Sequence, residues 1–195
     1  MSLKERAYSM LIVSSSDAFN TALTSLLPEF PCDTIHYASD ISAAKRAAAG
    51  RAYDFIIINS PVHDDQGLRF AINACASGNT VVLLMAKGDI HDEIYDIVAP
   101  HGIFTLAKPV SRAVMERALS WMVSSRERLR QFEKKTTSIE QKMEEIRLVN
   151  RAKWILISHE NLSEPDAHRF IEKTSMNRCI SRRQLAYEII DKYSG

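Results

Sequence analysis

Apolar residues in the first 110 positions of the chain alternate between two patterns. Short, mostly apolar runs predict strands at 8–13, 55–58, 80–84 and 103–106, and a further short strand is expected at 32–37. Between them, apolar residues recur every three or four positions, which predicts helices at 17–27, 41–49, 66–76 and 90–98. Strands that are apolar on both faces are typical of a parallel sheet covered by helices. We therefore predict a doubly wound α/β sandwich with a five-stranded parallel sheet.

The residues that follow or end these strands should meet at one edge of the sheet, where doubly wound folds place their functional crevice. They are Ser14, Ser15, Asn59, Met85 and Lys108. This set contains no carboxylate, and a hard cation such as Mg²⁺ needs anionic oxygen ligands. The sequence therefore predicts no metal, no cofactor and no catalytic residue at this edge, although a small ligand or a partner protein could still bind there.

This first part, 1–123, resembles the receiver domain of bacterial two-component response regulators over roughly residues 7–123. The resemblance rests on the order and spacing of the elements and on the pair Lys108-Pro109. Receivers carry two acidic residues after the first strand, a phosphoacceptor Asp after the third, and Thr or Ser after the fourth. The matching positions here hold Ser14 and Ser15, Asn59 and Met85. An amide cannot replace the nucleophilic carboxylate, so the resemblance implies a flavodoxin-like pseudo-receiver without a phosphoacceptor. We expect Lys108 to hydrogen-bond Asn59 or the carbonyl groups at the strand ends instead.

One long helix should follow, because neither Pro nor Gly occurs between Val110 and Pro165. Apolar residues recur along it with the spacing of an a/d heptad seam over about four repeats. The seam that we predict consists of Met122, Leu129, Phe132, Ile139, Met143 and Ile146. We assign 124–146 as a coiled-coil linker helix.

The charges that flank this seam test whether it joins two copies of the chain. In a parallel homodimer, the facing pairs would be Arg128 with Glu133, Lys135 with Glu140, and Lys142 with Arg147. Two of the three pairs are attractive, and each exposed pair contributes at most about 1 kcal/mol. We therefore expect a parallel homodimer, with packing of the stripe on the chain's own domains as the alternative.

The tail, 140–195, has the pattern of a small bundle of three helices. Ser163 and Ser181 are each placed to cap a helix, one followed by Pro165 and the other by Gln184. We expect the bundle to close on Leu162, Met176, and either Trp154 or Ile155.

This bundle resembles the ANTAR domain, an RNA-binding module of bacterial antitermination regulators. The matching fragments are Ala152-Lys153, Ile155-Leu156, Leu162-Ser163-Glu164 with Ala167, Ser175-Met176, and Leu185-Ala186. The resemblance implies that the chain binds hairpins in nascent leader RNA and so prevents a terminator stem from forming. The residues that we expect to contact RNA are Arg151, Lys153, Arg178, Arg182 and Arg183. Trp154 stands where the family usually has Gly, and its indole either packs in the core or turns outward, where it could stack on an unpaired base.

Charge and composition agree with these expectations. The whole chain has a net charge of +1, but its acidic residues dominate before position 120 and its basic residues after it, which favours a polyanion as partner of the tail. The sequence has no apolar run of the roughly 20 residues that would span a bilayer and no signal-peptide pattern. Its three cysteines are scattered without metal-ligand spacing. We therefore expect a cytoplasmic protein that does not bind membranes.

Two other functions remain open from sequence alone. A DNA-binding regulator with a helix-turn-helix would need polar, base-reading residues at the start of its last helix, and Arg182, Arg183 and Gln184 stand there. An enzyme or a phosphorylation switch would need chemistry in the front crevice, where the residues offer none.

Overall fold

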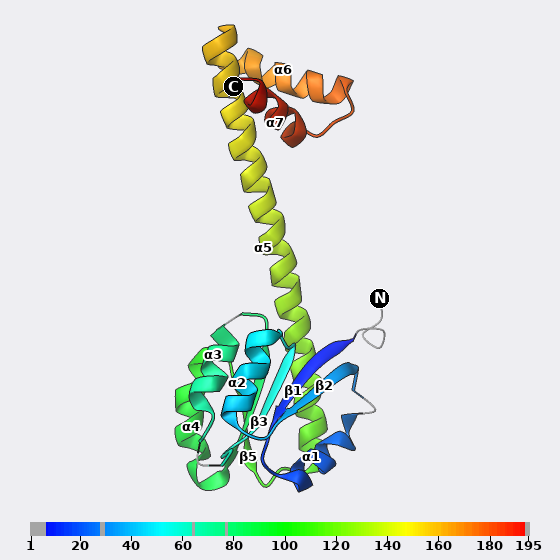
Figure 1. The fold of residues 1–195 in the computed structure, drawn as a ribbon, viewed down its shortest axis with the longest axis vertical. Coiled ribbons are helices and arrows are strands. Elements are labelled where there is room, and N and C mark those ends of the chain that lie inside the picture. Colours follow the sequence, from blue (N-terminus) through cyan, green and yellow to red (C-terminus); the bar gives the residue numbers. More distant parts are fainter. Residues whose placement is uncertain (1–6, 28–29, 64, 77, 194–195) are drawn as a thin grey trace. The chain divides into compact units, whose positions relative to one another are not determined.

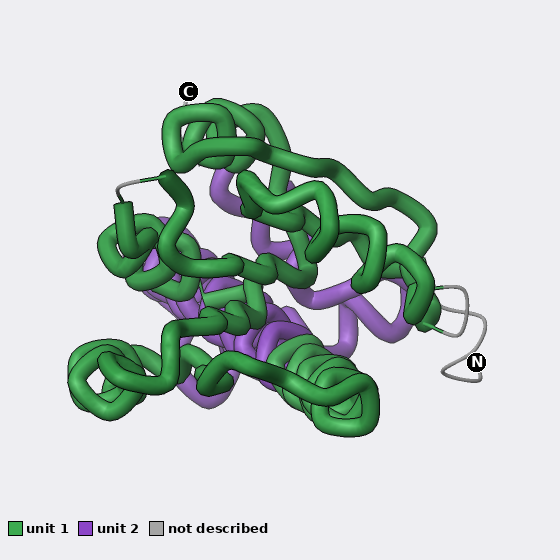
Figure 2. The backbone as a smooth tube through the Cα atoms, turned by 90° about the horizontal axis from the view of Figure 1, so that it is seen from below, with its two compact units in different colours: residues 1–131 green, residues 132–195 purple. Residues whose placement is uncertain are grey.

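The computed structural model describes residues 7–27, 30–63, 65–76 and 78–193. The chain divides into two compact units, residues 1–131 (unit 1) and 132–195 (unit 2), which Figure 2 distinguishes by colour. The elements of unit 1 are β1 (Tyr8–Val13), α1 (Asp17–Thr24), β2 (Cys32–Ala38), α2 (Ile41–Gly50), β3 (Phe55–Asn59), α3 (Leu68–Ala76), β4 (Val81–Lys87), η3 (Gly88–Ile90), α4 (His91–Val98), η4 (Ala99–His101) and β5 (Phe104–Lys108). Helix α5 (Arg112–Glu160) contributes to both units, and α6 (Glu164–Asn177) and α7 (Arg182–Lys192) complete unit 2.

Unit 1 is built on a parallel sheet with the strand order β2-β1-β3-β4-β5 (Figure 1), which confirms the predicted fold class. The three central strands are buried almost throughout, and this explains their continuous apolar runs. Helices α2, α3 and α4 cover one face of the sheet, whereas α1 and the first turns of α5 cover the other. Each face has its own hydrophobic cluster.

Polar side chains cap the N-termini of three helices in unit 1. The hydroxyl of Ser16 accepts from the N–H of Phe19, and the carboxylate of Asp40 accepts from the N–H of Ala43. The hydroxyl of Ser111 accepts from the backbone of α5 in the same way. Such caps satisfy backbone donors that have no partner in the helix and contribute about 1 kcal/mol each.

Strands β4 and β5 run further than the sequence pattern predicts. The apolar run that predicts β4 ends at Leu84, but pairing with β5 continues the strand to Lys87. Met85 therefore lies inside the strand and not after it. The same pairing places Lys87 directly opposite Lys108 at the carboxyl end of the sheet.

Unit 2 is a three-helix arrangement made by the second part of α5, α6 and α7. The side chains of Ser163 and Ser181 cap α6 and α7, as predicted. The buried residues of its core are Ala152, Leu156, Ala167, Ile171, Leu185, Ala186 and Ile189. One small alanine from each helix lies in this core, and small side chains allow helix axes to approach closely.

Met176, which we expected in this core, lies outside it, and so does Trp154, the alternative to Ile155. Trp154 is 69% exposed and Met176 is 76% exposed. Ala152 and Leu156, one turn apart, define the inward face of α5, and Trp154 lies about 200° around the helix from Ala152. Ile155 and Leu162 are partly buried against the core, so Ile155 is the residue of the expected pair that packs inward.

No helix in the described part of the chain is both long and apolar enough to cross a membrane.

Candidate functional site

Three polar side chains form a continuous hydrogen-bonded chain at the carboxyl edge of the sheet in unit 1. The amide of Asn59, at the end of β3, donates to the hydroxyl of Ser14 at 3.1 Å. The ammonium group of Lys108, at the end of β5, donates to the amide oxygen of Asn59 at 2.8 Å and to the carbonyl oxygen of Ser60 at 2.5 Å. Ser14, Asn59 and Ser60 are all buried. The hydrogen bonds that the sequence predicted for Lys108 are therefore both present.

The other two residues predicted for this crevice do not join the hydrogen-bonded chain. Ser15 is exposed. Met85 is adjacent to Asn59 in the β3–β4 ladder, but its side chain is buried in the cluster beneath α1 and α5. Its thioether thus extends the apolar surface on that face of the sheet.

The crevice does not fit the Mg²⁺ ion that receivers hold. The oxygens present at the acidic positions of receivers belong to two hydroxyls and an amide, which carry no charge. The amide oxygen of Asn59 already accepts from an ammonium group, and a cation at that place would meet the positive charge of Lys108. No group of three His, Cys, Asp or Glu side chains that could bind a metal occurs within the described ranges.

Two lysines carry like charges at this edge. Burial, with a contribution from the charge of Lys87, lowers the pKa of Lys108 below its ordinary value. Lys87 and Lys108 are partners in the ladder of β4 and β5, and their like charges repel each other. Ser14 and Asn59, the other side chains of the hydrogen-bonded chain, are uncharged.

The amino edge of the same sheet holds a charged cluster that sequence reasoning missed. Arg126 of α5, only 8% exposed, donates to the carboxylate of Asp54 at 2.8 Å. The other oxygen of Asp54 accepts from the N–H and the hydroxyl of Ser9. Burial raises the pKa of Asp54, but the hydrogen bonds from Ser9 and the ion pair with Arg126 outweigh it and hold that pKa below its ordinary value.

Further contacts extend this cluster to β1. The hydroxyl of Tyr8 donates to Glu127 at 2.6 Å, and Arg130 pairs with Glu127 at 3.2 Å. The guanidinium of Arg130 also lies 5.4 Å from the centre of the Tyr8 ring and 3.5 Å from Asp54. One signal in the sequence points to this arrangement: Met115, Leu119, Met122 and Arg126 follow each other at helical spacing. Arg126 therefore continues the buried face of α5.

The predicted dimer seam needs one correction. Met122 is completely buried in the sheet cluster of unit 1, and Leu129 is partly buried against the same cluster. The seam residues of unit 2 are more than half exposed: Phe132, Ile139, Met143 and Ile146. Asn150 and Trp154 follow Ile146 at intervals of four residues. Unit 2 therefore presents an apolar stripe along α5.

Four of the five cations expected to contact RNA pair with carboxylates inside unit 2. Lys153 lies 3.0 Å from Glu164, and Arg178 forms a two-pronged pair with Glu188 at 2.5 and 3.2 Å. Arg151 is exposed and forms no side-chain hydrogen bond or ion pair within the described part of the chain. Exposed ion pairs contribute only about 0–1 kcal/mol, so a phosphate group can displace such a partner.

The start of α7 faces acidic residues of α5. Arg182 lies 3.5 Å from Glu145, and Arg183 lies 3.2 Å from Glu144. Both guanidinium groups are exposed, so a phosphate group can displace these carboxylates too.

Known proteins resemble this chain in unit 2 and over most of its length. Residues 137–190 match the model of the ANTAR domain family. The transcriptional regulatory protein PdtaR of Mycobacterium tuberculosis is 20% identical over 182 residues, which cover 93% of this chain and 89% of PdtaR.

Solved structures of receiver domains share the fold of unit 1. The signal receiver domain of an HD domain-containing protein from Pseudomonas fluorescens is 23% identical, with a TM-score of 0.56 over 64% of this chain and 92% of that one. A CheY-like receiver domain from Methylobacillus flagellatus is 21% identical, with a TM-score of 0.51 over 60% and 99%. The chain thus joins a domain of the receiver fold to an ANTAR domain.

Proposed function

We propose that this protein is a transcription antitermination regulator that binds hairpins in nascent leader RNA. The match of residues 137–190 to the ANTAR domain carries the proposal, and the similarity to PdtaR over nearly the whole chain supports it. In this scheme, 1–123 is a pseudo-receiver, 124–146 is a coiled-coil linker and 140–195 binds RNA. Such a regulator acts in the cytoplasm, where transcripts emerge, and performs no catalysis.

The active form in this proposal is a parallel homodimer. Its support is the exposed apolar stripe of α5 in unit 2, with Ile139, Met143 and Ile146 at heptad spacing. Two RNA-binding units in one dimer would suit two hairpins on one transcript, because binding of the first raises the effective concentration of the second.

The unit 1 crevice works without phosphorylation in this proposal. Asn59 occupies the phosphoacceptor position, and the hydrogen bonds among Ser14, Asn59 and Lys108 use the polar groups that a phosphoryl group would need. A sensor protein or a small ligand would provide the input instead.

Binding assays with the purified chain test the RNA proposal directly. Transcripts of the source genome would be selected for binding, and a selected RNA with two hairpins would be compared with its single-hairpin truncation and with duplex DNA. We expect tight, salt-dependent binding of the tandem hairpins, at least tenfold weaker binding of one hairpin, and weak binding of DNA. Equal affinity for duplex DNA would refute the proposal.

The ion pair between Lys153 and Glu164 allows a sharper test of one RNA contact. If Lys153 binds phosphate, Lys153→Ala weakens RNA binding and Glu164→Ala strengthens it, because the latter releases the ammonium group. If the pair is only structural, both variants lower the melting temperature slightly. Their affinities for RNA then do not change in opposite directions. Arg151→Ala, one exposed cation nearby without an ion pair, provides the comparison for a simple loss of charge.

The oligomeric state tests the seam. Ile139→Asp places a charge on the exposed stripe, and we expect it to convert the dimer to a monomer in analytical ultracentrifugation. The matched control is Gln141→Asp, which adds the same charge at an exposed position off the stripe. A wild-type chain that sediments as a monomer at micromolar concentration would refute the dimer.

A further inference from the structure

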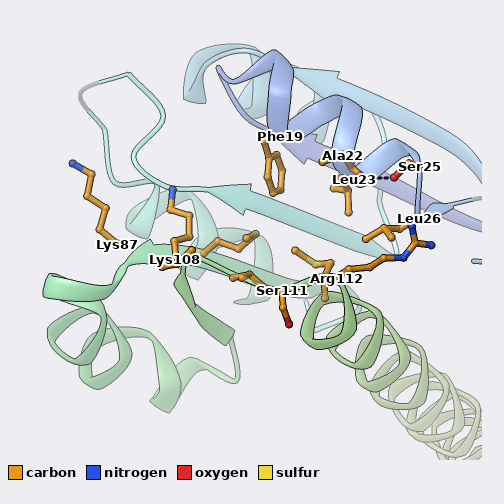
Figure 3. A pocket seen from close by; sticks show the side chains of 13 residues that line it. Phe19, Ala22, Leu23, Ser25, Leu26, Lys87, Lys108, Ser111 and Arg112 are labelled. Carbon is orange, nitrogen blue, oxygen red and sulfur yellow. Dashed lines mark hydrogen bonds between the residues drawn. The ribbon is translucent and has the colours of Figure 1, made fainter.

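Unit 1 contains a cavity of about 670 Å³ between α1, the carboxyl ends of β4 and β5, and the start of α5 (Figure 3). This volume lies within the range of small-molecule sites, roughly 300–1,000 Å³. Apolar side chains form most of its wall, among them Phe19, Leu26, Val110 and Met115. No Asp or Glu is among the described residues that line it.

Positive charge gathers at one end of this cavity. Lys87 and Lys108 both line it and stand directly opposite each other on β4 and β5. Figure 3 shows the two lysines at the same end, with Arg112 at the other end beside Leu26. Arg112 has a carboxylate partner, Glu116, at 2.7 Å, whereas neither lysine forms a salt bridge with a carboxylate of the described residues. A negative charge near the two ammonium groups would offset their repulsion.

We propose that this cavity binds a small amphipathic carboxylate, with its head group at Lys87 and Lys108 and its apolar body between α1 and α5. Met85 contributes to this fit because a thioether, where receivers have a hydroxyl, makes the floor beside the lysines apolar. The site does not depend on RNA binding by unit 2.

The charges of the lining favour a small molecule with one anionic end over a helix of a partner protein. The two lysines lie together at one end, and most of the remaining wall is apolar. An unbranched fatty acid of medium length fits the available space and presents one negative charge.

Titration calorimetry with the full chain tests the proposal, with sodium decanoate below its micelle concentration as the probe. We expect saturable binding of one decanoate per unit 1. Decylammonium, which carries the opposite charge on the same chain, should bind at least tenfold more weakly. Acetate, which lacks the apolar body, should give no measurable heat. Equal affinity for decanoate and decylammonium would overturn the proposal.

Matched variants locate the site. Ala22→Phe fills the cavity from α1 and should abolish binding, whereas Ala18→Phe adds the same ring to an exposed position of α1 outside the cavity. Lys87→Gln should weaken binding at least about tenfold, the value of a hydrogen bond to a charged group. Lys45→Gln, on α2 at the other face of the sheet, should leave it unchanged.

A measurement on the unaltered chain keeps the test decisive if Ala22→Phe fails to fold. A photoreactive diazirine analogue of decanoate would be cross-linked to the protein and the modified peptides identified by mass spectrometry. Cross-links to α1, to residues 85–87 or to residues 108–115 support the site. Cross-links confined to other segments, or unchanged decanoate binding by a folded Ala22→Phe variant, overturn it.

Discussion

The two edges of the sheet in unit 1 differ in whether their charged groups are paired with opposite charges. At the amino edge, Asp54 and Arg126 are both largely buried, and each charge meets an opposite one at hydrogen-bonding distance. At the carboxyl edge, Asn59 and Ser14 are neutral, and Lys108 donates only to uncharged oxygens. Buried charge is thus retained where it holds α5 against the sheet. Carboxylates are missing at the positions where receivers use them for phosphoryl chemistry. Four experiments test this contrast.

The largest effect should come from Asp54→Ala, which leaves Arg126 buried without its carboxylate. Breaking one side of a buried ion pair costs about 3–5 kcal/mol, and we expect the free energy of unfolding of unit 1 to fall by that amount. Urea titration in a Trp154→Phe background measures it, because Trp121 then reports unit 1 alone. Asp33→Ala, an exposed carboxylate on β2, should change stability by less than about 0.5 kcal/mol. A loss below about 1 kcal/mol for Asp54→Ala would show that the cluster does not hold α5.

Asn59→Ala should have a smaller effect at the carboxyl edge. It removes the acceptor of Lys108 and the donor to Ser14, and unsatisfied buried groups cost about 1–3 kcal/mol. The same urea titration measures the loss. Asn59→Asp retains an acceptor for both partners and should recover most of the stability. If Asn59→Ala is as stable as the wild type, the hydrogen-bonded chain is not structural.

The pH dependence of stability should separate the two edges. Because the folded pKa of Asp54 lies below its unfolded value of about 3.9, its contribution is complete above that value and is lost as the pH falls through the folded pKa. We expect the difference in unfolding free energy between the wild type and Asp54→Asn to stay constant from about pH 7 to pH 5 and to shrink below about pH 4. The difference for Asn59→Ala should show no such decline, since the hydrogen bonds that this substitution removes, to Ser14 and from Lys108, involve no carboxylate.

The last prediction is that phosphorylation does not occur. Incubation of the wild-type chain with acetyl phosphate and Mg²⁺ should leave its intact mass unchanged, because an amide cannot accept a phosphoryl group. Asn59→Asp alone should also remain unmodified, since Ser14 and Ser15 supply no carboxylate to hold the metal ion. A mass increase of one phosphoryl group in the wild type would contradict the pseudo-receiver interpretation.

Much of the fold followed from the sequence because local rules govern it. Continuous apolar runs identified the buried strands, and Ser163 and Ser181 identified two helix starts. The contact between Asn59 and Lys108 was predictable too, because residues at the carboxyl ends of parallel strands meet at one edge.

What the sequence did not reveal depends on contacts between distant segments. The pair of Asp54 and Arg126 joins residues 72 positions apart, and no local pattern specifies such a partner. Met122 fits the heptad seam, yet the sheet covers it because the buried face of α5 extends that far. Lys87 lines the cavity at the end of β4, which pairing with β5 extends beyond the apolar run.

The closed hydrogen bonding among Ser14, Asn59 and Lys108 also bears on how this protein can evolve. A return to phosphorylation would need acids at positions 14 and 15, an aspartate at 59 and a hydroxyl at 85, and no single one of these changes creates the reaction. Selection for phosphorylation therefore cannot favour any one of these substitutions alone. A crevice without these acids can adapt instead to an input other than a phosphoryl group.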